Sequence, residues 1–116
     1  MTARSGFAHR AVLALSPGTD RAAPGAAVTV ELCGHWEHEP PCPLAPHRTA
    51  VDGADDAVQV RVVFAAAPDD ETEVRRRIDA ALAGGEPRWR LLDSGAAALR
   101  DDERELADRL AGQPRD

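Results

Sequence analysis

The sequence contains no lysine, no asparagine and no tyrosine, although it is 116 residues long. All 14 of its basic residues are therefore arginine, and alanine, glycine and proline are abundant. Lysine and asparagine codons are rich in A and T, whereas codons for the abundant residues are rich in G and C. This pattern predicts a bacterial genome of high GC content, and it says nothing about function.

Large apolar side chains are also scarce. Leu, Ile, Val and Phe together number 22 of the 116 residues, close to the level below which a stable core becomes difficult to build. We therefore expect a thin core filled largely with alanine. The length fits a single domain, residues 1–116.

Long apolar runs are absent from the chain. No stretch approaches 18 apolar residues, so we expect no transmembrane helix. The longest early run, residues 11–15, is too short for the apolar region of a secretory signal, which favours a cytoplasmic protein. In a reducing compartment, the two cysteines are expected to be free thiols or metal ligands.

Negative charge is confined to one half of the chain. The formal net charge is −6, and residues 1–50 contribute none of it because four arginines balance four acids there. The acidic half, residues 51–116, would repel phosphate backbones and anionic membrane surfaces. A nucleic-acid binder and a membrane-surface protein are therefore disfavoured.

Alternation and helical spacing predict six regular elements. Strands are expected at residues 7–15, 26–33, 58–66 and 88–93, and helices at residues 69–83 and 99–111. The helix at 69–83 has the clearest signals, since Asp70 and Glu73 resemble a capping box and Gly84 follows its end. Residues 34–57, which are rich in proline, cysteine and histidine, are expected to form a long loop.

This order, β-β-β-α-β-α, predicts an α+β fold. We expect a small two-layer sandwich with a mixed four-stranded sheet and the first helix on its apolar face. A strand-helix-strand unit near the end of the chain would supply a parallel pair. The C-terminal segment, residues 99–116, is expected to pack beside that helix, to exchange with a second copy, or to fray.

Cysteine and histidine cluster in one short segment. Both cysteines and three of the four histidines lie within 15 residues, at Cys33, His35, His38, Cys42 and His47. Thiolate and imidazole are the ligands that zinc prefers, and four of them complete a tetrahedral structural site. The segment therefore predicts a zinc ion that orders the long loop.

The expected ligand set is Cys33, Cys42, His47 and one of His35 or His38. On an extended strand, Cys33 and His35 would project from the same face and reach one ion. The spacing differs from the usual zinc-finger pattern. A metal-free alternative therefore stays open, in which Cys33 packs as a small apolar residue and the histidines hydrogen-bond within the loop.

Two chemical alternatives use the same residues. An open site for copper or nickel would add Glu37 or Glu39 as an oxygen ligand or general base. A cysteine paired with a histidine would form a nucleophile and its base, although no oxyanion-hole candidate accompanies it. The first alternative would serve transition-metal handling or a small metal-dependent enzyme, and the second a small enzyme.

Two remaining features are assigned to surface and core. Arg75, Arg76 and Arg77 fan around a helix and are expected to be solvated. Trp89 is expected in the core, whereas Trp36, flanked by charged residues, is a candidate interface anchor. We predict a non-enzymatic accessory or regulatory protein whose zinc-ordered loop presents Trp36 to a protein partner or to a second copy.

Overall fold

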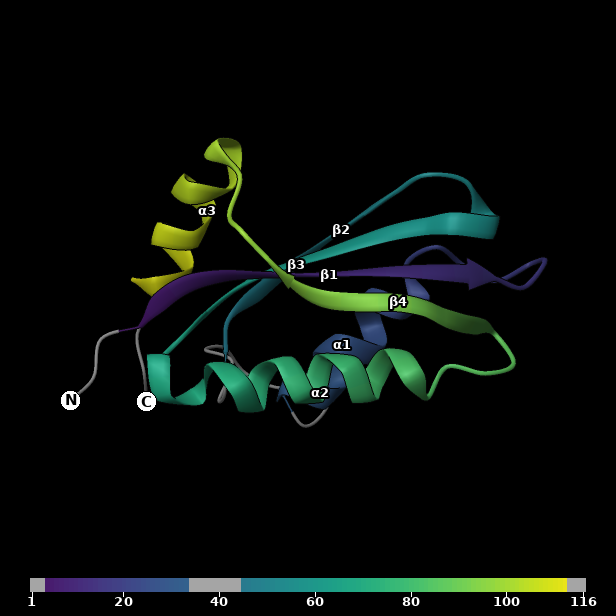
Figure 1. The fold of residues 1–116 in the computed structure, drawn as a ribbon, viewed down its shortest axis with the longest axis horizontal. Helices are drawn as coiled ribbons and strands as arrows, with labels where there is room; N and C mark the ends of the chain where they lie inside the picture. Colours follow the sequence, from purple (N-terminus) through teal and green to yellow (C-terminus); the bar gives the residue numbers. More distant parts are fainter. Residues whose placement is uncertain (1–3, 34–44, 113–116) are drawn as a thin grey trace.

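The computed structural model describes residues 4–33 and 45–112 (Figure 1). Four strands form one sheet in the order β2-β3-β1-β4, and every neighbouring pair is antiparallel. The elements in chain order are β1 (Ser5–Leu15), α1 (Ala23–Cys33), β2 (His47–Asp52), β3 (Val58–Ala66), α2 (Glu71–Ala83), β4 (Trp89–Ala97) and α3 (Asp101–Ala111).

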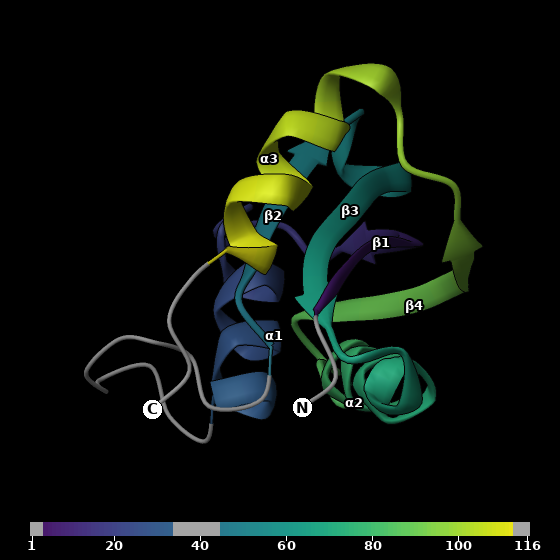
Figure 2. The same ribbon diagram turned by 90° about the vertical axis from the view of Figure 1, so that its left-hand side faces the viewer.

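The helices occupy both faces of the sheet (Figures 1 and 2). Helices α1 and α2 cover one face, and α3 lies against the other near the start of β1. The first six elements follow the order β-α-β-β-α-β, which is the arrangement called ferredoxin-like. This fold is shared by proteins of many functions, so it assigns none here.

The predicted α+β class and the four-stranded sheet with the helix at 69–83 on its apolar face are confirmed. The prediction of a mixed sheet is wrong, because all neighbouring strands are antiparallel. Strands β3 and β4, which flank α2, do run in the same direction. They are not paired, because β1 lies between them.

The predicted strand at 26–33 is wrong, because these residues belong to helix α1. Val28 and Leu32 are four residues apart and both are buried, whereas Val30 is 40% exposed. The alternation of these side chains fits a strand, but their burial follows the helical spacing. The carboxylate of Asp20 accepts the Ala22 N–H at 2.9 Å, which satisfies one of the free donors where the helix begins.

The predicted loop at 34–57 is wrong for its second part. Residues His47–Asp52 form strand β2, whose side chains alternate between half-buried and exposed. Asp55–Ala57 then form a short 3-10 turn before β3. Since β2 pairs only with β3, it is an edge strand of the sheet, and none of its side chains is fully buried.

The main core lies between the sheet and helices α1 and α2. Trp89, predicted to be a core residue, is 1% exposed, and its indole N–H donates to the Leu82 carbonyl at 2.7 Å. Its ring also lies against Gly85, where an added Cβ would overlap the ring. The aliphatic and aromatic core residues come from β1, β3 and α2 (Leu13, Val58, Val60, Val62, Phe64, Val74, Ile78 and Leu82).

Helix α3 covers part of the opposite face with a smaller apolar cluster. Ala107 and Leu110 of the helix are buried against Val63 and Ala65 of β3. The approach to β1 is close, because a Cβ placed on Gly6 would lie 2.5 Å from the Ala107 Cβ. The expectation that this segment packs beside the helix at 69–83 is wrong, because α3 packs on the opposite face of the sheet. Among the described residues, none of the helices combines the length and apolar character needed to cross a bilayer.

Candidate functional site

The structure places two of the predicted metal ligands at the two ends of one connection. Cys33 is the last residue of α1 and His47 is the first residue of β2. The other predicted residues, His35, Trp36, His38 and Cys42, lie outside the described residues. The expected strand geometry for Cys33 is wrong, because its backbone is helical.

The His47 imidazole is held on both sides. Its Nδ1 lies 3.2 Å from the carbonyl oxygen of Ala45, and its Nε2 lies 3.0 Å from the hydroxyl oxygen of Thr29. A carbonyl only accepts, so Nδ1–H is the donor and Nε2 faces α1. Nε2 contacts Thr29, which lies one helical turn before Cys33, the last residue of α1.

The contact of Nδ1 with a carbonyl is one that zinc-ligating histidines also make, but here Nε2 contacts the Thr29 hydroxyl, which also donates to the Gly25 carbonyl at 3.1 Å. A ligating imidazole commonly donates its second ring N–H to a backbone carbonyl, which fixes the ring and leaves the other nitrogen for the metal. Within residues 4–33 and 45–112, no three Cys, His, Asp or Glu side chains are grouped closely enough to hold an ion. A complete site would therefore require ligands from residues 34–44.

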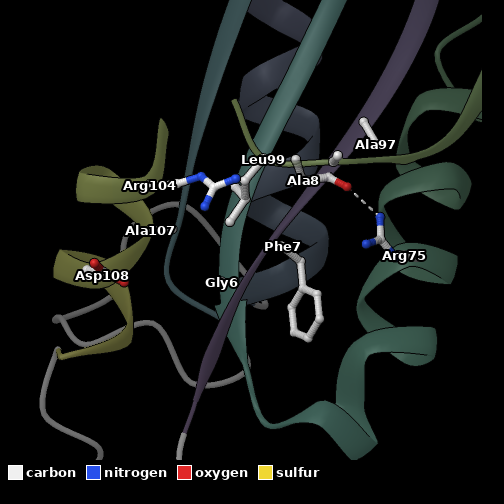
Figure 3. A pocket seen from close by; sticks show the side chains of 10 residues that line it. Gly6, Phe7, Ala8, Arg75, Ala97, Leu99, Arg104, Ala107 and Asp108 are labelled. Atoms are coloured by element: carbon white, nitrogen blue, oxygen red, sulfur yellow. Dashed lines mark hydrogen bonds between the residues drawn. The ribbon is translucent and has the colours of Figure 1, made fainter. Parts of the chain in front are cut away.

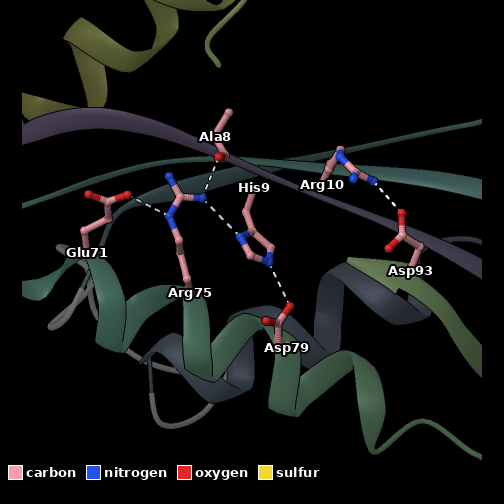
Figure 4. A network of polar contacts seen from close by, with 7 residues as sticks. All are labelled: Ala8, His9, Arg10, Glu71, Arg75, Asp79 and Asp93. Carbon is pink, nitrogen blue, oxygen red and sulfur yellow. Dashed lines mark hydrogen bonds and ion pairs between the residues drawn. The ribbon is translucent and has the colours of Figure 1, made fainter. Parts of the chain in front are cut away.

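A second candidate is a polar network between β1 and α2 (Figure 4). His9 of β1 is only 2% exposed. Its Nε2 lies 2.7 Å from Asp79 Oδ1, and its Nδ1 lies 3.1 Å from an Arg75 terminal nitrogen. The same Arg75 nitrogen donates to the Ala8 carbonyl at 2.7 Å, and Arg75 Nε donates to Glu71 at 2.8 Å.

The contacts of His9 determine which ring nitrogen carries the proton in its neutral form. Arginine has only donors, so Nδ1 must accept from Arg75. Nε2–H then donates to the carboxylate of Asp79, as in many histidine-carboxylate pairs. The pair links β1 to α2, with the His9 side chain buried and the Asp79 side chain 43% exposed.

The expectation that all three consecutive arginines are solvated is wrong for Arg75. Its side chain is 16% exposed, whereas that of Arg76 is 64% exposed. The Arg75 guanidinium carbon lies 5.8 Å from the Phe7 ring centre and 5.4 Å from that of Phe64, so it also makes cation–π contacts. Arg76 and Arg77 instead pair with Glu73, whose pKa they lower to about 2.

A cavity of about 560 Å³ opens beside Arg75, between α2 and α3 (Figure 3). Arg75 forms one wall, and Arg104 and Asp108 of α3 form the opposite wall. The remaining lining is apolar or small, from Gly6, Phe7, Ala8, Ala97, Ala98, Leu99 and Ala107. This volume lies within the range of small-molecule sites.

An ion pair holds α3, which forms one wall of the cavity, to the sheet. Arg61 of β3 donates to both oxygens of Glu103, at 2.8 and 2.6 Å, and also to the Ala98 carbonyl at 3.0 Å. The Arg61 hydrogen bonds lower the pKa of Glu103, and Glu103 raises the pKa of Arg61. Both side chains are about one-seventh exposed, at 14% and 13%, so the pair is shielded from solvent.

The residues around the cavity were not predicted as a site. Helical spacing alone places the three arginines around the helix, and only the tertiary packing selects Arg75 for burial. The signal that was available is His9, a polar residue on the apolar face of the predicted strand at 7–15. A buried histidine requires hydrogen-bond partners, but the sequence does not show which distant residues supply them.

The order and pairing of the strands define a small α+β protein of ferredoxin-like topology. Comparison with known proteins finds no matching family model, no matching curated protein and no matching solved structure.

Proposed function

We propose that the chain is a small, non-enzymatic cytoplasmic accessory or regulatory protein of bacterial origin. A zinc ion would fasten the connection between α1 and β2. The ligands would be Cys33, Cys42, His47 and one of His35 or His38. The ordered segment would present Trp36 to a protein partner or to a second copy of the chain.

The orientation of His47 carries this proposal. Its Nδ1 is committed to the Ala45 carbonyl, and its Nε2 faces α1 one turn before Cys33. A zinc ion near that helix end would bind Nε2 in place of the Thr29 hydroxyl that now contacts it. The clustering of cysteine and histidine in the sequence supplies the remaining ligands.

Metal content of the purified chain tests the proposal. The protein would be prepared without a chelator and without a nickel column, and zinc would be measured per chain by mass spectrometry. We expect about one zinc, and none in a Cys33→Ser, Cys42→Ser variant. His9→Gln is the matched control, because it removes the one histidine outside the segment and should leave zinc content unchanged.

Cobalt substitution separates a structural site from an open one. Thiolate-to-cobalt absorption reports cysteine ligation, and d–d bands that do not change when cyanide is added indicate four protein ligands and a structural site, because no position is open to exchange. Three protein ligands and a water would instead favour the small metal-dependent enzyme. Metal-free protein that is fully reduced would refute the zinc site and leave a metal-free interaction module.

A further inference from the structure

We infer that the cavity between α2 and α3 binds a small carboxylate with an apolar body, such as a short fatty acid or an aromatic acid. The cavity is built from residues other than those of the Cys/His segment, so this inference is independent of the proposed zinc site. It rests on one oriented guanidinium, a second positive group opposite it, and an apolar floor.

The first observation is the way Arg75 is held. Arg75 Nε donates to Glu71, and one terminal nitrogen contacts both the Ala8 carbonyl and His9. Within the described part of the chain, the other terminal nitrogen makes no hydrogen bond, and in Figure 4 it points away from His9 and Asp79. Arg75 also lines the cavity, so a fixed N–H donor is available there to an anionic ligand.

The second observation is the charge of the opposite wall. Arg104 is 68% exposed and only 3.5 Å from a carboxylate oxygen of Asp101, which is too long for a strong hydrogen bond. With Arg75 it gives the lining two positive groups against one negative group, Asp108. Glu71 and Asp101 already pair with these two arginines from outside the lining, so a ligand carboxylate would be recognised through the remaining Arg75 N–H and not through an excess of positive charge. A dianion would be disfavoured by Asp108 and by the net charge of −6.

The third observation is the apolar floor between the two walls. Phe7 is only half-buried and borders the main core, whereas Leu99 borders the α3 cluster, so the two apolar side chains line the cavity from opposite sides of β1 (Figure 3). Burying an aliphatic or aromatic group against these side chains would add affinity that a simple anion cannot gain. The cavity therefore favours a carboxylate that carries an apolar group of several carbons.

Titration of the full chain with hexanoate tests this inference. Binding would be followed by NMR, through the Arg75 Nε–Hε and Phe7 signals. Hexanamide, a neutral molecule of similar shape, should bind about tenfold more weakly because it loses the charge-assisted hydrogen bond. Inorganic phosphate should not shift these signals. Equal binding of hexanamide, or equal binding of phosphate, would overturn the inference.

Two variants on α3 provide a matched pair. Arg104→Glu reverses a charge on the cavity wall, and we expect it to weaken hexanoate binding roughly fivefold or more. Arg109→Glu reverses an arginine of similar exposure, 66%, that pairs with Glu105 at the same 3.5 Å and does not line the cavity. If both variants weaken binding equally, the effect is one of overall charge and the site is refuted.

A third variant fills the cavity without changing its charge. Ala97→Leu adds three carbons to a half-buried position on the wall, and circular dichroism would establish that the variant is folded. We expect hexanoate binding to be lost. Unchanged binding to folded Ala97→Leu protein would place the ligand elsewhere and overturn the inference.

Discussion

Adding one methyl group at Gly6 should push α3 away from the sheet. An alanine Cβ at this position would lie 2.5 Å from the Ala107 Cβ and 3.4 Å from Leu99 Cδ1. Ordinary van der Waals contact begins near 3.4 Å, so the helix would have to move by about 1 Å. Overpacking of this kind costs about 1–3 kcal/mol of folding free energy.

Urea unfolding, followed by tryptophan fluorescence and circular dichroism, would measure this cost for Gly6→Ala. A matched control is Gly95→Ala on the same face of the sheet, where the new Cβ would meet only an Arg10 nitrogen at 3.8 Å. That substitution should be neutral or stabilising by up to about 1 kcal/mol, because alanine loses less conformational freedom than glycine in a strand.

A double-mutant cycle makes the test specific to the contact between Gly6 and α3. Ala107→Gly should cost about 1 kcal/mol through helix propensity, but it also removes the methyl group with which the Cβ added by Gly6→Ala would clash. The double variant should therefore be more stable than the sum of the single effects by about 1 kcal/mol or more. Strictly additive effects would refute the close docking of α3 on β1.

Three further substitutions test other parts of the structure by the same unfolding measurement. Arg75→Ala should lower the stability by about 2–4 kcal/mol because it leaves the Ala8 carbonyl and the Glu71 carboxylate without this partner. The exposed Arg76 is the control, and Arg76→Ala should have little effect. Equal effects would contradict the burial of Arg75. Gly85→Ala should cost at least about 3 kcal/mol because the new Cβ would overlap the Trp89 ring, and a folded variant of normal stability would show that the ring sits elsewhere. Glu103→Gln should destabilise the protein by about 1–3 kcal/mol at neutral pH. Because the pKa of Glu103 is lowered in the folded state, this difference in stability should shrink as the pH falls below the ordinary value of 4.5. A difference that does not depend on pH would refute the ion pair.

The elements that the sequence predicted correctly have two agreeing signals each. The strand at 58–66 alternates from Val58 to Val62 and then continues as an apolar run, and the helix at 69–83 has acidic residues at its start, glycine after its end and an apolar stripe between them. The helix also has two ion pairs at i,i+4 spacing, Glu71–Arg75 and Glu73–Arg77. Local sequence and tertiary packing favour the same conformation in these segments.

Helix α1 shows why other segments could not be assigned. Its β-branched residues, Val28, Thr29 and Val30, alternate as in a strand, and β-branched residues favour strands. The helix is selected by packing against α2 and β2, which local sequence does not reveal. Strand β2 escaped detection for a related reason, since an edge strand has few buried side chains.

The polar network lies beyond sequence reasoning for a geometric reason. His9 and Asp79 are 70 residues apart, and Arg61 and Glu103 are 42 residues apart. Each residue has several partners of opposite charge available in the chain, and only the strand register selects one. The Cys/His segment is the opposite case, because its residues are neighbours in the sequence and its metal site stays a prediction.

Because β1 lies inside the sheet, it must wait for later strands to be synthesised before it can pair. Strand β1 leaves the ribosome before the other strands of the sheet, and both of its neighbours, β3 and β4, are translated later. Until residue 66 has emerged, β1 has no partner on one edge, and until residue 97 it has none on the other. An unpaired strand is a template for pairing between chains. Slow translation across the β3–β4 interval would therefore extend the period in which newly made chains can aggregate.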